Sequence, residues 1–486
     1  MISKQEIIDS ATNMSLTPHV VEKDFALGWI LAGIFANEKL ADSWIFKGGT
    51  CLKKCYFETY RFSEDLDFTL TDESHLDEGF LKTAFKEVAD WVYNESGIEM
   101  PADNQKFDIY TNPRGSISCQ GKLPYLGPVS PRSGGMPRIK LDLTCDERVV
   151  LAPVKRPVFH PYSDEPEGKI FALSYCYEEV FGEKVRALAE RTRPRDLYDV
   201  INLFRNDNEK PAAPVLLDVI KQKCEFKDIG LPQLTELAKH RDDLTGSWHG
   251  MLDHQLPALP SVDNYWDALG VFFDWLYGIS EPVPLSALSS ASDDVVIRER
   301  KLPSTLPSRS QPILEIVRFA AANRLCVQLT YRKEHGEITT PIIEPYSLRQ
   351  SNAGNISLHG FDVSKDGNRS YRVDRIQAAQ VTNQSFAPRY EVELTANGPV
   401  SVLPTASRTR GFASGRNPTM RSAPIRARAA KRSRAVANYG PKYVYQCPTC
   451  QKKFTRKKRD SKLNKHKNDW GGQCTGRSGF LIEMKY

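Results

Sequence analysis

Two aspartates, two residues apart, are the residues of this sequence whose type and spacing best fit a defined chemistry. Asp65 and Asp67 alternate with the apolar residues Leu66 and Phe68, a pattern typical of a half-buried strand. Such a strand places both carboxylates on one face, where they repel each other unless a cation lies between them. The pair therefore predicts a magnesium site for work on phosphates.

A phosphate-binding turn is predicted just before this strand. The apolar run 44–46 is expected to form a short buried strand, and Lys47-Gly48-Gly49-Thr50 breaks it where a helix can begin. Paired glycines permit positive φ and leave backbone N–H groups uncovered, and a helix N-terminus adds positive potential, so the turn suits a phosphate. Either half alone has an ordinary explanation, since acidic pairs also occur on solvated strands. Together, in this order, they resemble the nucleotidyltransferase core of the DNA polymerase beta-like enzymes.

A third carboxylate is predicted on a neighbouring strand. The segment Arg138–Thr144 alternates strictly, which turns Ile139, Leu141 and Leu143 toward the core and Asp142 away from it. Beside Asp65 and Asp67, Asp142 would complete a cage for two metal ions. Taken alone, it would be an ordinary surface residue.

Two helices predicted within residues 174–205 carry the remaining candidate charges. Lys184 lies off the apolar stripe of the first helix, where it would neutralise a triphosphate. Asp196 and Asp199 lie three apart on one face of the second helix. This acidic pair either stabilises its own helix or fixes Arg195 or the nucleotide end of the site.

These motifs, in this order, resemble the AbiEii toxin family of bacterial abortive-infection and toxin–antitoxin systems. The resemblance covers about residues 1–285. It rests on Glu22-Lys23-Asp24, Lys47-Gly48-Gly49-Thr50-x-Leu52, Arg61-Phe62-Ser63-x-Asp65-x-Asp67, Glu183-Lys184-x-x-Ala187 and Arg195-Asp196-x-Tyr198-Asp199.

The resemblance implies a nucleotidyltransferase sheet followed by a helical region, and transfer of nucleotides, in some members to the 3′ end of tRNA. It implies that Asp65 and Asp67 bind magnesium, that Lys184 contacts the triphosphate, and that Asp196 or Asp199 completes the site. It also implies a nucleotide-binding set and a cognate antitoxin. The nucleotide-binding residues would be Lys47, Gly48, Gly49, Thr50, Arg61, Ser63 and Lys184.

The length and charge of the chain predict several domains. Its 486 residues are many for one domain, and residues 394–486 hold 21 Lys and Arg against 3 Asp and Glu, whereas the rest of the chain is acidic. A basic tail predicts contact with a polyanion. The ten cysteines show no regular pairing, no leader opens the chain, and the longest near-apolar run falls short of the roughly 20 residues that span a membrane, so we expect a cytoplasmic protein.

Residues 286–312 are expected to form a linker, and residues 313–396 a small β-barrel after one helix. This barrel resembles a WYL domain, an SH3-like barrel of bacterial regulators and defence proteins, with Ile356-Ser357-Leu358 where that family shows Trp-Tyr-Leu. Candidate ligand-binding residues are Tyr331, Arg369, Arg372 and Arg375, which suit a nucleotide or nucleic acid. The alternative is that these arginines are solvated.

The C-terminal part combines a basic linker and a zinc finger. Residues 397–440 contain nine Lys and Arg and no acidic residue, a composition that predicts disorder. Within residues 441–486, the donors Cys447, Cys450, His466 and Cys474 have the types and spacing of zinc ligands. Six basic residues between 452 and 459, among them Lys457, Lys458 and Arg459, predict contact with nucleic acid.

The predicted protein is therefore an α+β multidomain chain, and three functions fit it. The first is a magnesium-dependent toxin that transfers nucleotides from a nucleoside triphosphate (NTP) to RNA, most simply to the tRNA 3′ end. The second is a regulator that binds nucleic acid through the barrel and finger. The third is an enzyme that modifies a protein side chain.

Overall fold

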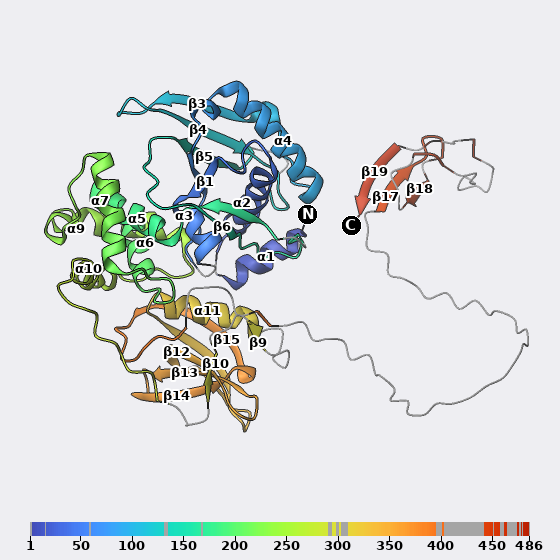
Figure 1. Ribbon diagram of the computed structural model, residues 1–486. Helices are drawn as coiled ribbons and strands as arrows, with labels where there is room; N and C mark the ends of the chain where they lie inside the picture. The colour runs from blue at the N-terminus through green and yellow to red at the C-terminus, as the bar shows by residue number, and fades with distance from the viewer. Residues whose placement is uncertain are drawn as a thin grey trace, which may run out of the picture. The chain divides into compact units, whose positions relative to one another are not determined.

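The computed structural model describes most of the chain, with gaps, and it forms two compact units, residues 1–407 and 408–486 (Figure 1). Each unit is described by itself. The described residues are 2–14, 16–57, 60–130, 135–166, 169–289, 294–297, 301–302, 310–394, 401–402, 442–450, 452–456, 461–463, 474–475, 478 and 480–485.

A seven-stranded mixed sheet forms the centre of the N-terminal domain, with strand order β3-β4-β5-β2-β1-β7-β6. β2 pairs in parallel with β5, and β1 in parallel with β7, while the other neighbours are antiparallel. The predicted alternation is confirmed, because Leu66, Phe68 and Leu141 are fully buried. The strands are β1 (Trp44–Lys47), β2 (Asp65–Leu70), β3 (Lys106–Thr111), β4 (Ile117–Pro124), β5 (Arg138–Thr144), β6 (Val154–Pro157) and β7 (Phe171–Ser174).

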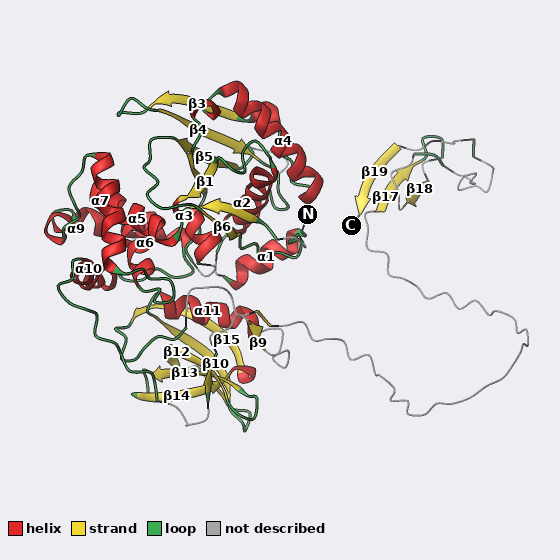
Figure 2. Ribbon diagram, in the orientation of Figure 1, coloured by secondary structure: helices red, strands yellow, loops and turns green. Residues whose placement is uncertain are grey.

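Helices α2 (Pro18–Ala36) and α4 (Glu78–Ser96) pack on each other and on this sheet (Figure 2). α4 begins where Asp77 accepts a hydrogen bond from the Phe80 N–H and ends at Gly97, which takes a left-handed φ of 75°. The preceding α1 (Lys4–Asn13) is capped by Ser3 in the same way. Between β1 and β2 lie a four-residue helix, α3 (Gly48–Cys51), and a π-helical turn, η1 (Leu52–Tyr56). Two single 3₁₀ turns flank α4, η2 (Glu73–His75) and η3 (Ala102–Asn104).

A helical region follows the sheet and carries part of the candidate site, as predicted (green in Figure 1). α5 packs against both α6 and α7, and Tyr265, Phe272 and Trp275 of α10 are buried in its core. The helices are α5 (Tyr177–Arg191), α6 (Pro194–Phe204), α7 (Ala213–Lys227), α8 (Leu234–Ala238), α9 (Arg241–Leu252), η4 (Asp253–Gln255) and α10 (Val262–Leu276).

The second half of the first unit is a curled antiparallel sheet with one helix against it. Its core is continuous with that of the N-terminal domain, and the buried Asn323 Oδ1 accepts hydrogen bonds from Tyr198 (2.7 Å) and Tyr265 (2.9 Å). The elements are α11 (Ser310–Ala322), β8 (Val295–Val296), β9 (Lys301–Leu302), β10 (Leu325–Arg332), β11 (Ile338–Thr339), β12 (Ile342–Gln350), β13 (Ile356–Asp362), β14 (Gly367–Arg372), η5 (Val373–Arg375), β15 (Ile376–Ser385) and β16 (Ser401–Val402).

The second unit contains a three-stranded antiparallel sheet of order β18-β17-β19. Its strands are β17 (Lys442–Gln446), β18 (Lys453–Arg456) and β19 (Phe480–Lys485). The whole chain is thus α+β, as the sequence predicts. Across the described residues of both units, no helix combines the length and the apolar character needed to cross a membrane.

Candidate functional site

Three carboxylates lie on one face of two adjacent strands. Asp67 on β2 stands opposite Asp142 on the parallel strand β5, and Asp65 lies two residues earlier on the same face. All three side chains are half-buried. Burial and the neighbouring charge of Asp142 raise the pKa of Asp67 to about 6, and burial raises the pKa of Asp65. A divalent cation would relieve this repulsion, so the donor set fits magnesium.

The glycine turn packs directly against these carboxylates. Gly48 has a φ of 79°, and a Cβ added there would lie 2.1 Å from Oδ2 of Asp67. A Cβ on Gly49 would lie 2.6 Å from a terminal nitrogen of Arg61 and 3.2 Å from Oγ of Ser63. Thr50 is buried, and its hydroxyl donates to the backbone carbonyl of Asp65. Only glycine, which has no side chain, fits at positions 48 and 49 of this turn.

A fully buried aspartate holds two cations together beside the turn. Asp199 on α6 accepts two hydrogen bonds of 2.7 Å from Arg61, one of 2.8 Å from Tyr60, and a salt bridge of 2.8 Å from Lys184 on α5. Burial would raise the pKa of Asp199, but Arg61 and Lys184 outweigh it and hold that pKa far below its usual range. Arg61 and Lys184 are therefore held in fixed positions by one anion.

The other predicted members of this set have different partners. Asp196 accepts hydrogen bonds of 2.7 and 2.8 Å from Arg191, while Arg195 donates to the carbonyl of Met251. Asp196 and Asp199 therefore bind different arginines. The arginine that Asp199 holds is Arg61, not Arg195.

Lys47 is buried in a network of charges at the end of β1. Its ammonium group lies 3.6 Å from Glu147 and 3.9 Å from Glu183. Burial disfavours the charged amine, but these two carboxylates raise the pKa of Lys47 above its usual value. Glu147 could not be predicted from the sequence, because only the fold brings it to β1 from a distant segment.

The tripeptide Glu22-Lys23-Asp24 at the start of α2 ties three segments together around the site. Glu22 accepts hydrogen bonds from the N–H (2.8 Å) and hydroxyl (2.9 Å) of Ser130, Lys23 bonds Glu64 at 2.8 Å, and Asp24 bonds Lys54 at 2.7 Å. These contacts attach the loop after β4, the approach to β2 and the turn η1 to one helix. Residue types alone did not signal this role, and only the family resemblance drew attention to the motif.

Most of the predicted ligand residues of the barrel already have partners within the barrel. The Tyr331 ring packs edge-on against Tyr371, Arg372 bonds Asp374 at 2.8 Å, and Arg375 lies 3.5 Å from Glu334. Arg369 is exposed and donates to the carbonyl of its neighbour, Asn368.

The thiols of the predicted zinc finger meet in the second unit. One sulfur from each of Cys447, Cys450 and Cys474 lies within 4.8 Å of the others, and Cys447 and Cys474 are 3.7 Å apart. None of the ten cysteines, all of them described, forms a disulfide. Three converging thiols fit a zinc ion. The fourth predicted ligand, His466, and the basic residues Lys457, Lys458 and Arg459 lie outside the described residues.

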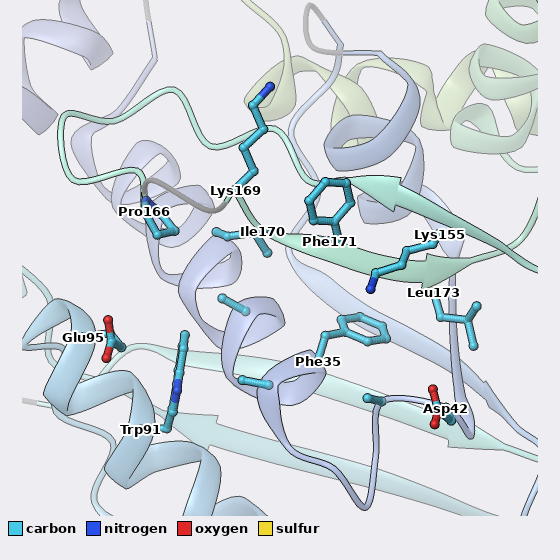
Figure 3. Close-up of a pocket in the computed structure, with 13 residues that line it drawn as sticks. Phe35, Asp42, Trp91, Glu95, Lys155, Pro166, Lys169, Ile170, Phe171 and Leu173 are labelled. Atoms are coloured by element: carbon cyan, nitrogen blue, oxygen red, sulfur yellow. The ribbon is translucent and has the colours of Figure 1, made fainter.

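A cavity of about 310 Å³ lies away from the carboxylates, between α2, α4 and the strands β6 and β7 (Figure 3). Phe35, Trp91, Lys155 and Phe171 are among its lining residues, and none of the predicted site residues lines it. The candidate site therefore does not coincide with this cavity.

Two family models match parts of this chain. Residues 29–270 match the family described as nucleotidyl transferase AbiEii toxin of type IV toxin–antitoxin systems, and residues 312–381 match the WYL domain. The structure of MenT4, a nucleotidyltransferase toxin from Mycobacterium tuberculosis, is similar at 16% identity, 58% coverage of this chain, 91% of that chain and a TM-score of 0.40. The proteasome accessory factor PafBC of Arthrobacter aurescens is similar at 15% identity, with coverages of 38% and 23% and a TM-score of 0.16. Both TM-scores are too low to support a functional argument, and no curated protein matches the sequence.

A mixed sheet with a glycine turn against paired aspartates, together with the matched family, defines an NTP-dependent nucleotidyltransferase. The chain contains an AbiEii nucleotidyltransferase toxin domain at residues 29–270, and a WYL domain follows it at residues 312–381. The family resemblances predicted from the sequence are confirmed.

Proposed function

We propose that this chain is a magnesium-dependent toxin that transfers nucleotides from an NTP to RNA, with the tRNA 3′ end as acceptor. The observation that carries the proposal is the position of Asp65, Asp67 and Asp142 against the Gly48-Gly49 turn. Carboxylates beside a phosphate-binding turn are the arrangement that phosphoryl transfer requires.

Each group has a task in this proposal. The backbone at Gly48 and Gly49 lies close enough to the carboxylates to hold a phosphate beside them. Arg61 and Lys184, which Asp199 orients, neutralise the triphosphate and the leaving pyrophosphate. Magnesium held by Asp65 and Asp67, with Asp142, supplies charge neutralisation at the α-phosphate and activation of the acceptor hydroxyl. Most of the rate enhancement comes from positioning these groups.

The acceptor is proposed to be RNA because the C-terminal part of the chain is strongly basic. Lys and Arg side chains bind phosphates without regard to sequence, which suits a tail that brings RNA to a separate catalytic domain. A zinc ion bound by the three clustered thiols would order the finger. The family match to type IV toxin–antitoxin systems supports a cognate antitoxin as a further partner.

The test incubates the full chain with total bacterial tRNA, magnesium and each labelled NTP in turn. The control is the double variant Asp65→Ala/Asp67→Ala. We expect label on tRNA with one NTP, none with the double variant, and none in the presence of EDTA. A second control, deletion of residues 397–486, should abolish RNA labelling while NTP binding is retained.

Two results would contradict the proposal in different ways. Label on protein but not on RNA would make a protein side chain the acceptor. No label on either acceptor, with nucleic-acid binding intact, would favour a regulator that acts through the WYL domain and finger.

A further inference from the structure

A second cavity, of about 100 Å³, lies where the helical region meets the WYL half of the first unit. It is bounded by the residues that follow α6, by the end of α11 and by the segment after β15. Its lining contains two arginines, one from each side. The lining residues are Asn202, Arg205, Asn206, Asp207, Asn208, Ala322, Arg324, Glu391, Val392, Glu393 and Leu394.

Arg205 is held in place by its neighbours, but one of its N–H donor groups has no hydrogen-bond acceptor in the described part of the chain. One terminal nitrogen donates to the carbonyl (3.3 Å) and the side-chain oxygen (3.2 Å) of Asn264, and the guanidinium lies 4.8 Å from the centre of the Tyr265 ring. The other terminal nitrogen is buried with no acceptor in the described part of the chain. Buried donors without acceptors are rare, because each costs about 1–3 kcal/mol.

Arg324 approaches the same cavity from the other domain. It follows α11 in a left-handed conformation, with a φ of 56°, and one of its nitrogens donates to the carbonyl of Ala321. Among the described residues, neither Arg324 nor Arg205 forms a salt bridge. No carboxylate oxygen of that part of the chain therefore lies within 4 Å of their side-chain nitrogens. Burial and the like charge of Arg205 lower the pKa of Arg324. Arginine nevertheless stays protonated in proteins, so two positive charges adjoin the cavity without a counter-ion.

The acidic residues of the lining do not supply that counter-ion. Glu393 is paired with Arg349 at 3.1 Å, and Asp207 is largely exposed and paired with Lys210 at 2.5 Å. Glu391 is exposed at the rim. The anion that would neutralise the two arginines must therefore come from outside this part of the chain.

We propose that Arg205 and Arg324 bind a phosphate group, either inorganic phosphate or the phosphate of a small ligand, in the cavity between the two domains. Arginine presents forked N–H donors that match phosphate oxygens, and the cavity has room for one such group. Arg205 lies six residues after Asp199, at the end of the same helix that holds Arg61 and Lys184. A phosphate bound there would add a further contact between the helix that carries Asp199 and the WYL domain.

The test measures binding of inorganic phosphate to the full chain by calorimetry at constant ionic strength. The central variant is Arg324→Asn, because asparagine removes the guanidinium and still tolerates a left-handed φ. Arg205→Gln removes the other cation. Its phosphate affinity tests the proposal in the same way if Arg324→Asn does not fold. The matched control is Arg241→Gln, which removes a cation elsewhere whose partner Asp263 is exposed. A further variant, Lys184→Gln, reports whether phosphate binds in the candidate triphosphate site instead.

We expect phosphate binding to weaken about tenfold or more in Arg324→Asn and Arg205→Gln, and to be unchanged in Arg241→Gln. Repeating the titration with a sugar phosphate distinguishes a larger ligand from the free ion. Equal affinity in wild type and Arg324→Asn would overturn the proposal. So would loss of binding in Lys184→Gln alone, because the phosphate would then occupy the triphosphate site.

Discussion

Asp67 shows how the demands of chemistry and stability conflict at a single residue. Its carboxylate is half-buried and stands opposite Asp142, and its raised pKa of about 6 reports that the ionised form is disfavoured in the absence of a cation. A carboxyl whose pKa rises on folding destabilises the fold when ionised, so this cost is absent below about pH 4 and complete above about pH 6.

Replacing Asp67 by Asn should therefore stabilise the metal-free protein while abolishing activity. We expect a gain of about 1–3 kcal/mol in the free energy of unfolding at pH 7 in EDTA, because a buried charge beside Asp142 is removed. Urea titration measures this gain, and the tRNA-labelling assay measures the loss of activity. A less stable variant at pH 7 would show that Asp67 is already neutralised by the protein alone.

Gly48 should tolerate no side chain, because a Cβ there collides with Asp67. Gly115, which also has a positive φ but has open space around it, is the matched comparison. Gly48→Ala and Gly115→Ala both force a Cβ onto a positive φ, which costs about 1–2 kcal/mol, but only the Cβ at 48 collides with Asp67. We expect activity to fall about 100-fold in Gly48→Ala and to stay near wild type in Gly115→Ala. Equal activities at saturating NTP would show that the turn does not position Asp67.

Asp199 should contribute stability in a pH-independent way across the neutral range. Asp199→Asn leaves Arg61 and Lys184 buried without their anion, and we expect a loss of about 3–5 kcal/mol. Because its folded pKa lies below the unfolded value of about 3.9, the contribution is complete above pH 5 and is lost only as the pH falls below about 4. Urea titrations of both proteins at pH 5, 6.5 and 8 should give one constant difference, and a difference that varies over this range would assign Asp199 another partner.

At the scale of residues, the sequence predicts features that depend on a short local pattern, such as the face of a strand on which a side chain lies. Asp65, Asp67 and Asp142 could be placed on one face because strand alternation is a local rule, and the register of β2 with β5 agrees. The partner of Asp199 could not be found in this way. Arg61 lies 138 residues earlier in the chain, and Arg195 was the nearer candidate. Buried ion pairs between distant segments depend on the tertiary structure alone.

At the scale of elements, α2 organises the site without contributing a catalytic group. Its second turn binds the loop after β4, the residue before β2 and the turn η1 through three consecutive charged side chains. A Cβ on Gly127 would lie 2.6 Å from Oε1 of Glu22, so the loop follows this carboxylate closely. We infer that α2 sets the distance between the glycine turn and the loop.

Removing the Glu22 carboxylate should release that loop. Glu22→Ala leaves the N–H groups of Val129 and Ser130 without their acceptor, and we expect faster amide exchange there with a loss of about 1–3 kcal/mol. Glu6→Ala is the matched control, because Glu6 accepts the same kind of bonds from Ser163 near the surface, where water replaces them. Unchanged protection of residues 129 and 130 would show that the loop is held by other contacts.

The elements themselves were the most predictable part of the fold. The strand Arg138–Thr144 has the predicted bounds, and the helix starting at Pro194 begins where proline favours a first turn. The π-helical turn at Leu52–Tyr56 was not predicted, because its sequence fits an α-helix equally well. Its side chains are all buried, and Lys54 bonds Asp24 there, so tertiary contacts select the wider turn.

At the scale of the molecule, the two domains of the first unit share one core. Asn323 is buried and joins Tyr198 of the catalytic helix α6 to Tyr265 of α10. The sequence predicted two domains and a linker but not this junction. Tyr198, Tyr265 and Asn323 are far apart in the sequence, so no local sequence pattern indicates that two hydroxyls donate to one amide oxygen.

Asn323→Ala should therefore destabilise both domains together. We expect a loss of about 1–3 kcal/mol in one cooperative transition, because two buried hydroxyls lose their acceptor. Asn383→Ala, at an exposed position of the same barrel, is the control and should change stability by less than about 0.5 kcal/mol. Separate transitions, with only the barrel affected, would show that the domains fold independently.

During synthesis of the chain, Asn323 is added long after the helix α6 to which it is hydrogen-bonded. The catalytic helix α6 leaves the ribosome roughly 120 residues before Asn323, which at about 5–20 residues per second is a delay on the order of ten seconds. During that interval Tyr198 lacks its hydrogen-bond acceptor, and α6 lacks the domain it packs against. A nascent chain, or a fragment from a message cut short before this codon, therefore lacks the hydrogen bonds that join Tyr198 and Tyr265 to the WYL domain.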